Sequence, residues 1–209
     1  MARRNSNVLS GDVEEARGQI LEAAQSTFLH FGVGKTTMDD IAKAAGVSRP
    51  TIYRYFRDRD TLIAELIRLR SRKLFVKGTK YVLEREHFRD QIVDGLVFLV
   101  DRGRKDPLIR LIVSPEHMDL AAAVVGTSKL ASELTLEMWA PILDRARERG
   151  ELRAEITNEE AAEWLALVQL ILVGRLDFAD PDDPSHRKLI ETFVLPAFLT
   201  SPASGVPAR

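Results

Sequence analysis

The sequence contains no cysteine, which excludes disulfide bonds and thiolate chemistry and fits a reducing environment. Long apolar runs are missing too. The longest, Trp164 to Val173, is interrupted by Gln169 and is too short to cross a bilayer. No apolar stretch of signal-peptide length follows Arg3 and Arg4. We therefore expect a cytoplasmic protein that has no membrane partner.

Motifs typical of enzymes are missing as well. The sequence has no Gly-rich phosphate loop, no nucleophile elbow and no His–Glu metal motif. Within the expected helices, no histidine has a second histidine or a carboxylate at the i, i+4 spacing of a helical metal site, and His87 has only some acids nearby. We expect no catalytic residue, no metal and no cofactor. An enzyme built on the scattered acidic residues stays an alternative.

Charge of one sign is scarce overall but is unevenly distributed. The net charge is −1, yet residues 1–73 contain 13 Lys and Arg against 9 Asp and Glu, while the remainder contains 17 against 22. A basic N-terminal third on an acidic body suits a local contact with phosphates.

Apolar residues recur every three or four positions and period-two alternation is rare, which predicts an all-α fold. Gly and Pro mark the expected helix ends. The expected helices are 14–31, 36 or 37 to 46, 48–56, a longer one capped by Asp58 or Asp60, 84–104, 107–113, 116–125, 127–149, 158–178 and 185–199. Residues 1–13 and 201–209 are predicted to be flexible tails.

Two of these helices have the layout of a helix-turn-helix. They are joined by Ala45-Gly46-Val47, in which Gly46 can adopt the left-handed conformation that a sharp turn needs. Thr37 and Asp40 form a capping-box pattern at the start of the first. A compact apolar seam is expected from Ile41, Val47, Ile52 and Phe56. In such a motif the second helix enters the major groove of DNA.

The second helix carries side chains suited to DNA. Arg49 and Arg54 can reach guanine edges or phosphates. Ser48 and Thr51 can bond to phosphates or bases, and the hydroxyls of Tyr53 and Tyr55 suit phosphate oxygens.

This stretch resembles the DNA-binding domain of the TetR family of bacterial regulators. The matching residues are Thr36-Thr37, Asp40-Ile41-Ala42, Ala45-Gly46-Val47-Ser48, Thr51-Ile52-Tyr53, Tyr55-Phe56, Arg59-Asp60 and Leu62. The resemblance is specific from Arg17 to Leu62 and looser beyond it. Two departures are Pro50, where the family often has Gly, and Arg59, where it usually has Lys.

The resemblance implies a homodimeric, ligand-responsive regulator, a repressor by analogy, released from a palindromic DNA operator by a small molecule. The apolar middle region of the chain favours a hydrophobic effector. The resemblance also implies a helix-turn-helix domain at 14–57 and a helical ligand-binding and dimerisation domain at 58–200. Together with the chemistry above, it predicts DNA contacts at Thr36, Thr37, Ser48, Arg49, Pro50, Thr51, Tyr53, Arg54, Tyr55 and Arg59.

The C-terminal part offers weaker signals. Candidate ligand residues are Phe98, Arg110, His117, Met138, Trp139 and Arg175, although each is also compatible with an ordinary core or paired side chain. Candidate dimer residues are Trp164, Leu165, Val168, Leu172, Phe193 and Ala197, because the helix from Asn158 is apolar nearly all round. A constitutive DNA-binding module and a purely structural dimerisation protein stay alternatives.

Overall fold

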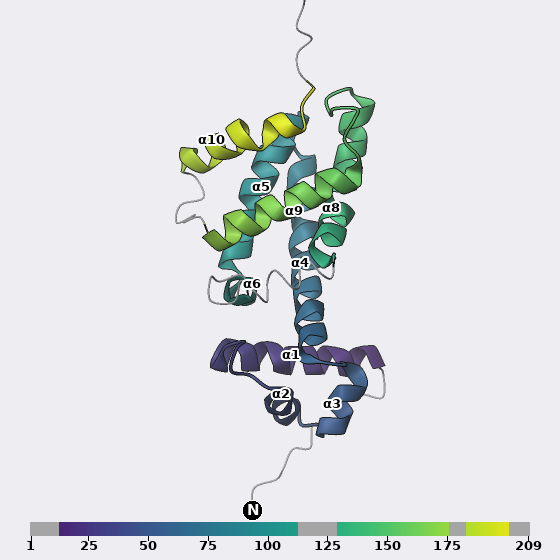
Figure 1. Ribbon diagram of the computed structural model, residues 1–209, viewed down its shortest axis with the longest axis vertical. Helices are drawn as coiled ribbons and strands as arrows, with labels where there is room; N and C mark the ends of the chain where they lie inside the picture. The colour runs from purple at the N-terminus through teal and green to yellow at the C-terminus, as the bar shows by residue number, and fades with distance from the viewer. Residues whose placement is uncertain (1–12, 113–128, 176–182, 201–209) are drawn as a thin grey trace, which may run out of the picture.

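The computed structural model describes residues 13–112, 129–175 and 183–200, and these residues are mainly helical (Figure 1). In chain order the elements are α1 (Val13–Phe31), α2 (Met38–Ala44), α3 (Arg49–Tyr55), α4 (Arg59–Leu83), α5 (Phe88–Lys105), α6 (Pro107–Ile112), α8 (Leu130–Glu148), α9 (Asn158–Arg175), α10 (Pro184–Phe193) and the 3₁₀ turn η3 (Leu195–Ala197). The predicted all-α fold is confirmed. The predicted helix 116–125 and both predicted tails, except Val13, lie outside the described residues.

The first three helices form a small unit, here called the head (residues 13–56). Helix α1 lies across α2 and α3 at one end of the molecule (Figure 1). Its apolar stripe buries Ile20, Ala24 and Phe28, which pack on Ile41 and Ile52 of the two shorter helices. The four-residue spacing of these side chains places them on one side of α1, which therefore supplies one wall of the head core.

Helix α4 connects the head to the remaining helices, here called the body (residues 59–200). Its first half belongs to the head core through Leu62, Ile63 and Leu66. Its second half belongs to the body core through Val82. One continuous helix is therefore packed into both units, as its position between them in Figure 1 shows.

The body core is centred on α5, α8 and α9. Trp139 is fully buried there, and a Cβ atom placed on Gly95 would lie only 2.7 Å from its Cη2 atom. A Cβ atom on Gly78 of α4 would lie 2.9 Å from the Cε atom of Met138. Glycine at these two positions lets large side chains of α8 lie directly against the backbones of α4 and α5.

Two helix predictions need correction. The helix predicted at 185–199 ends at Phe193, because Pro196 has no N–H to donate and its ring opposes a continuous helix. The helix predicted from Glu84 begins at Phe88, since Glu84 is the C-terminal cap of α4. No helix in the described part of the chain is both long and apolar enough to span a membrane.

Candidate nucleic-acid interface and pocket

The start of α2 is fixed by the capping box predicted from the sequence. The Thr37 hydroxyl accepts from the Asp40 backbone N–H at 3.2 Å, and the Thr37 N–H donates to Asp40 Oδ2 at 3.0 Å. The side-chain and backbone hydrogen bonds from Thr37, in that order, lower the pKa of the Asp40 carboxyl. The helix start is therefore held by an ionised carboxylate at neutral pH.

The turn between α2 and α3 closes through glycine. Gly46 has a φ of +70°, as its predicted left-handed role requires. The Val47 N–H donates to the Ala42 carbonyl at 2.9 Å, and the Gly46 N–H donates to the Lys43 carbonyl at 3.2 Å. These two bonds make a Schellman motif, which satisfies the last carbonyls of α2 and sets the direction in which α3 leaves.

Helix α3 is capped by Ser48, whose hydroxyl accepts from the Thr51 N–H at 3.3 Å. The same hydroxyl lies 2.8 Å from Thr51 Oγ1, so the two side chains satisfy each other in this structure. Pro50 sits in the first turn, where its missing N–H costs no helical hydrogen bond. The departure at Pro50 therefore leaves the helix intact.

The basic side chains of α3 lie on its exposed side. Arg49 is paired with Asp39 of α2 at 3.0 Å, and both partners remain accessible to water. The guanidinium of Arg49 lies over the Tyr53 ring, and that of Arg54 lies over the Tyr55 ring. No acidic residue occurs between Arg49 and Tyr55. The face is cationic and rich in hydroxyl groups, a combination that suits phosphates and base edges.

Two of the predicted DNA contacts hold the head together. Thr36 is buried and donates its hydroxyl to the Gly32 carbonyl at 2.8 Å. Arg59 donates to the carbonyls of Val33 and Thr36 at 3.1 and 3.2 Å. In this structure both residues tie α4 and the end of α1 to the loop before α2, and Thr36 is not on the exposed surface.

The individual role of Arg17 was not predicted from the sequence. Its guanidinium donates to the Tyr55 carbonyl at 3.0 Å and lies over the Phe56 ring, 4.7 Å from the centroid. This side chain from α1 therefore fixes the C-terminal end of α3. Its partners are 38 and 39 positions away in the sequence, so no local pattern could have indicated them.

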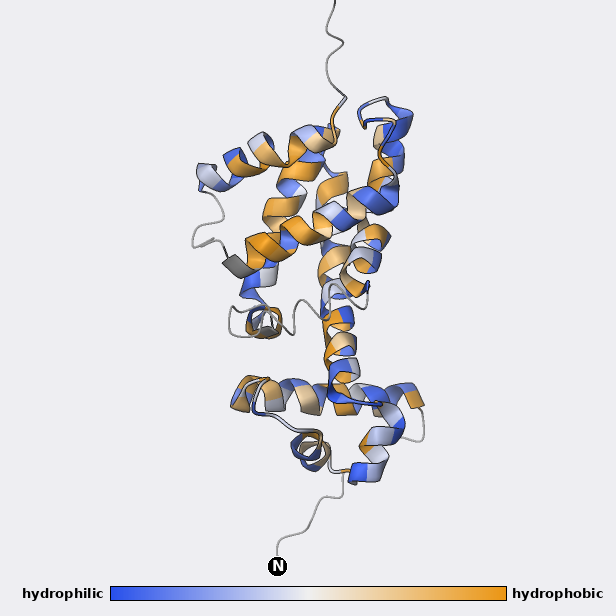
Figure 2. Cartoon of the chain, in the orientation of Figure 1, coloured by the Kyte–Doolittle hydropathy of each residue, from blue (hydrophilic) through white to orange (hydrophobic). Residues whose placement is uncertain are grey.

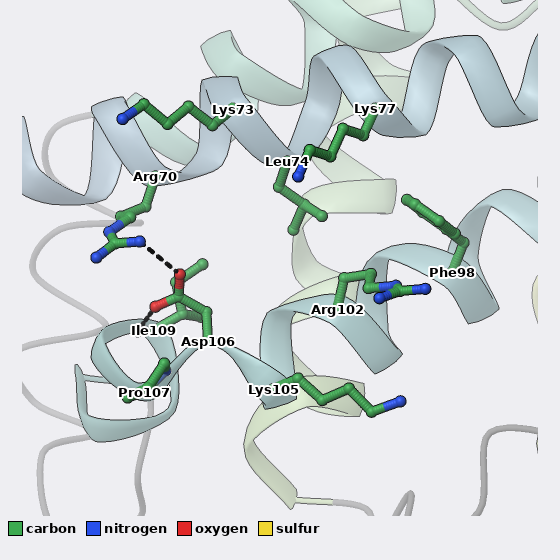
Figure 3. A pocket seen from close by; sticks show the side chains of 10 residues that line it. All are labelled: Arg70, Lys73, Leu74, Lys77, Phe98, Arg102, Lys105, Asp106, Pro107 and Ile109. Atoms are coloured by element: carbon green, nitrogen blue, oxygen red, sulfur yellow. Dashed lines mark hydrogen bonds and ion pairs between the residues drawn. The ribbon is translucent and has the colours of Figure 1, made fainter.

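A second feature is a pocket of about 510 Å³ between α4, α5 and α6 (Figure 3). It is lined by Arg70, Lys73, Leu74, Lys77, Phe98, Arg102, Lys105, Asp106, Pro107 and Ile109. Arg70 and Asp106 pair at 3.3 Å across one end, and Asp106 also accepts from the N–H groups of Leu108 and Ile109. The pocket is therefore adjacent to the start of α6.

The structure places the predicted ligand residues in different environments. Phe98 lines the pocket, whereas Met138 and Trp139 are buried in the body core. Arg110 is exposed on α6 and is not among the residues lining the pocket. His117 and the side chain of Arg175 lie outside the described residues.

The predicted dimer residues divide into two groups. Leu165, Val168 and Leu172 are buried in the core of their own chain, so they do not form an exposed face. Trp164 and Phe193 are 41% and 73% exposed. Ala197 is half-buried.

Leu167 and Ile171 are not among the predicted dimer residues. They are 43% and 51% exposed and share one side of α9 with Trp164 at helical spacing. Figure 2 shows how apolar α9 is in its second half. Because α9 is apolar on nearly all sides, its sequence does not indicate which side faces outward.

Among the described residues, no group of three or more His, Asp or Glu side chains is arranged to hold a metal ion.

Comparison with known proteins supports the predicted family. The family model of "Bacterial regulatory proteins, tetR family" matches residues 20–66, which contain most of the head and the start of α4. An uncharacterised helix-turn-helix-type transcriptional regulator of Mycobacterium bovis is 28% identical over 201 residues, covering 94% of this chain and 97% of that protein.

Solved structures share the fold. The TetR family repressor AlkX from a Dietzia strain, implicated in biodegradation of n-alkanes, has a TM-score of 0.61 at 23% identity and covers 88% of this chain and 97% of its own. The regulator FadR from Bacillus subtilis, in complex with stearoyl-CoA, has a TM-score of 0.57 at 16% identity and covers 84% and 97%. The head and the start of α4 therefore match the TetR family of bacterial regulatory proteins, and the described chain has the fold of solved TetR family regulators.

Proposed function

We propose that this protein is a ligand-responsive repressor that binds a palindromic DNA operator as a homodimer and is released by a small molecule. The observation that carries the proposal is the exposed face of α3, with Arg49, Arg54 and their neighbouring hydroxyls on a helix free of acidic residues. Such a face fits the major groove. As a DNA-binding protein of a bacterium, it would act in the cytoplasm.

Within this proposal the ten predicted DNA residues have two kinds of role. The exposed or partly exposed residues of α3 and its cap contact DNA directly, while Thr36 and Arg59 position the head from inside. Arg49 exchanges Asp39 for a phosphate or a base when DNA arrives. The Thr37 hydroxyl is close to the start of α2 and adds a contact to the DNA backbone.

A second copy of the chain is the proposed partner of the apolar surface on α9 and α10. Trp164, Leu167 and Ile171 form one exposed stripe, and Phe193 adds an exposed ring on α10. Large apolar side chains gathered on one face mark interaction surfaces. Two-fold symmetry would place the two α3 helices roughly 34–36 Å apart, one turn of DNA.

The effector site of the proposal is the pocket between α4, α5 and α6. FadR, which shares the fold, binds stearoyl-CoA in its solved structure, so a body of this kind can hold a small molecule. The pocket is connected to the head in two ways. Helix α4 runs into both cores, and Leu108 of α6 is buried in the head core. A ligand that prefers one arrangement of α4 and α6 therefore shifts the spacing of the two heads.

The test is fluorescence anisotropy of the purified protein on DNA from upstream of its own gene, against scrambled DNA, over a series of salt concentrations. We expect sequence-dependent binding that weakens steeply with salt, because lysine and arginine release counterions from phosphates. A fragment library of neighbouring promoters serves as the second arm if the gene's own promoter is not the target.

Absence of binding to every fragment at every salt concentration would contradict the proposal and favour a structural dimerisation protein or an enzyme. Specific binding by a protein that stays monomeric would contradict the homodimer. Sedimentation velocity of the protein alone and of its Ile171→Glu variant separates these outcomes, because the variant places a charge in the proposed dimer face.

A further inference from the structure

The pocket lining carries an excess of positive charge. Five of its ten residues are cationic and one is acidic. Arg70, Lys73 and Lys77 follow one side of α4, while Arg102 and Lys105 lie on α5 across the opening (Figure 3). Like charges three and four residues apart on a helix repel each other. A negatively charged ligand in the cavity would relieve this repulsion.

The protein's own carboxylates neutralise only part of this charge. Arg70 pairs with Asp106 at 3.3 Å, Lys105 pairs with Asp101 at 2.8 Å, and Arg102 lies 3.7 Å from the same Asp101 carboxylate. Within the described ranges, Lys73 and Lys77 have no carboxylate within 4.0 Å. These two ammonium groups therefore remain available to an anion.

The other lining residues form an apolar surface. Leu74 points into the space between α4 and α5, and Phe98 lies on the neighbouring turn of α5 (Figure 3). The Phe98 ring stacks on Tyr81, with 4.5 Å between centroids and 18° between planes, so its orientation is fixed. Ile109 and Pro107 add apolar surface from α6. Cationic heads and apolar side chains thus share one cavity.

We propose that the effector is an anionic amphiphile with a phosphate-bearing head group and a hydrocarbon tail. The head group binds between Lys73 and Lys77 of α4 and Arg102 of α5, and the tail packs on Leu74 and Phe98. A phosphate dianion matches two uncompensated lysines better than a single carboxylate does. This inference rests on the proposed function, because it assigns a ligand class to the same effector site.

The experiment compares ligands that share one tail and differ only in the head. Dodecyl phosphate, dodecanoate, dodecanol and dodecyltrimethylammonium are titrated into the full-length protein by calorimetry, each below its micelle concentration. Inorganic phosphate tests the head alone, and dodecanoyl coenzyme A tests a larger source of phosphate with the same tail. We expect the two phosphorylated amphiphiles to bind most tightly and their affinity to fall with salt.

The variant Lys73→Gln/Lys77→Gln removes the uncompensated charges without touching an ion pair. Its matched control is Lys80→Gln, another exposed lysine of α4 that does not line the pocket. We expect the double variant to lose roughly three- to thirtyfold in affinity for dodecyl phosphate, as for two accessible ion pairs. Affinity for dodecanol and the thermal unfolding midpoint should stay unchanged, and the control should bind as the wild type does.

Equal affinity for the phosphate, the carboxylate and the alcohol would overturn the charge assignment. Equal affinity for inorganic phosphate and dodecyl phosphate would overturn the role of the tail. Unchanged affinity in the double variant would overturn the placement of the head group. Each of these results leaves operator binding untouched, so the anisotropy measurement separates failure of this inference from failure of the proposed function.

Discussion

The head and the body of this protein use their polar residues differently. In the head, short-range hydrogen bonds such as Thr37 with Asp40 and Ser48 with Thr51 determine where helices start, and the basic residues of α3 point outward. In the body, cationic residues from the two consecutive helices α4 and α5 gather around a cavity. A surface that reads DNA can be specified locally, whereas a pocket depends on how helices are packed.

The largest expected effect is loss of the head core. Ile52→Ala removes a fully buried side chain between α3 and α1, and we expect it to lower the free energy of unfolding by about 2–5 kcal/mol. Urea denaturation measures the change. Operator affinity should fall while binding of dodecyl phosphate persists. Val76→Ala, at a 72% exposed position on α4, is the control and should change stability by less than about 0.5 kcal/mol.

If ligand binding fell as far as operator binding in the Ile52→Ala variant, the head and body would fold as one cooperative unit. The two regions would then have separate functions but would not unfold separately.

A complementary change acts on the body. Gly95→Ala places a methyl group 2.7 Å from Trp139 Cη2 and 2.8 Å from Val82 Cγ2. Because this overpacks the core, we expect the free energy of unfolding to fall by about 1–3 kcal/mol. Thermal and urea unfolding measure it. Gly18→Ala in α1 has nothing within 4 Å of the new methyl group and should stabilise by up to about 1 kcal/mol. The packing described for α5 and α8 requires that Gly95→Ala lowers the free energy of unfolding while Gly18→Ala raises it. A change in the same direction for both variants would contradict that packing.

Binding to DNA should depend on α3 more than on total charge. Arg54→Ala is expected to weaken operator binding by about 1–3 kcal/mol if the guanidinium reads a base. Arg153→Ala makes the same change in net charge at the far end of the body, where Arg153 pairs with Glu155, and should have little effect. Anisotropy on the operator measures both. Similar losses in the two variants would indicate a general electrostatic effect instead of a specific contact.

The smallest expected effect concerns the link between the two regions. Asp58 caps α4 by accepting from the Thr61 N–H at 2.8 Å, and hydrogen bonds from the Thr61 hydroxyl and then its backbone lower the pKa of the carboxyl. Because the folded-state pKa is depressed, this stabilisation is present above the ordinary aspartate pKa of about 4 and is lost as pH falls through the lowered value. Asp58→Ala should cost about 1 kcal/mol at pH 7.

Unfolding free energies measured between pH 3 and pH 7 test the assignment. Asp58→Asn keeps an acceptor for the Thr61 N–H, so it should retain part of the stability while losing this part of the pH dependence. If the free energy of unfolding of Asp58→Asn depended on pH as that of the wild type does, another carboxylate would account for the loss of stability at low pH.

Most of the head could be predicted from the sequence because its signals are local. The capping box at Thr37, the left-handed Gly46 and the cap at Asp58 each depend on residues within a few positions of one another. The roles of Arg17 and Arg59 could not be predicted in this way. Their hydrogen-bond acceptors are 23 to 38 residues away, so only the folded chain brings them together.

The body shows the same limit more strongly. The sequence of α9 indicates that the helix is covered on more than one side, because it is apolar nearly all round. It does not indicate which side packs against its own chain. Among the predicted dimer residues, Leu165, Val168 and Leu172 are buried in their own chain, whereas Trp164 lies on the exposed stripe with Leu167 and Ile171. The pocket cations were also missed, because their spacing along α4 resembles that of any solvated helix face.

By itself, the sequence determined the helical class, the resemblance to the TetR family and the local chemistry of the helix-turn-helix. These depend on periodicity, caps and turns, which act over one or two helical turns. The tertiary structure alone decided which apolar residues face outward and which cations surround a cavity. Those properties arise from packing between helices dozens of residues apart, where close approach at Gly78 and Gly95 sets the geometry.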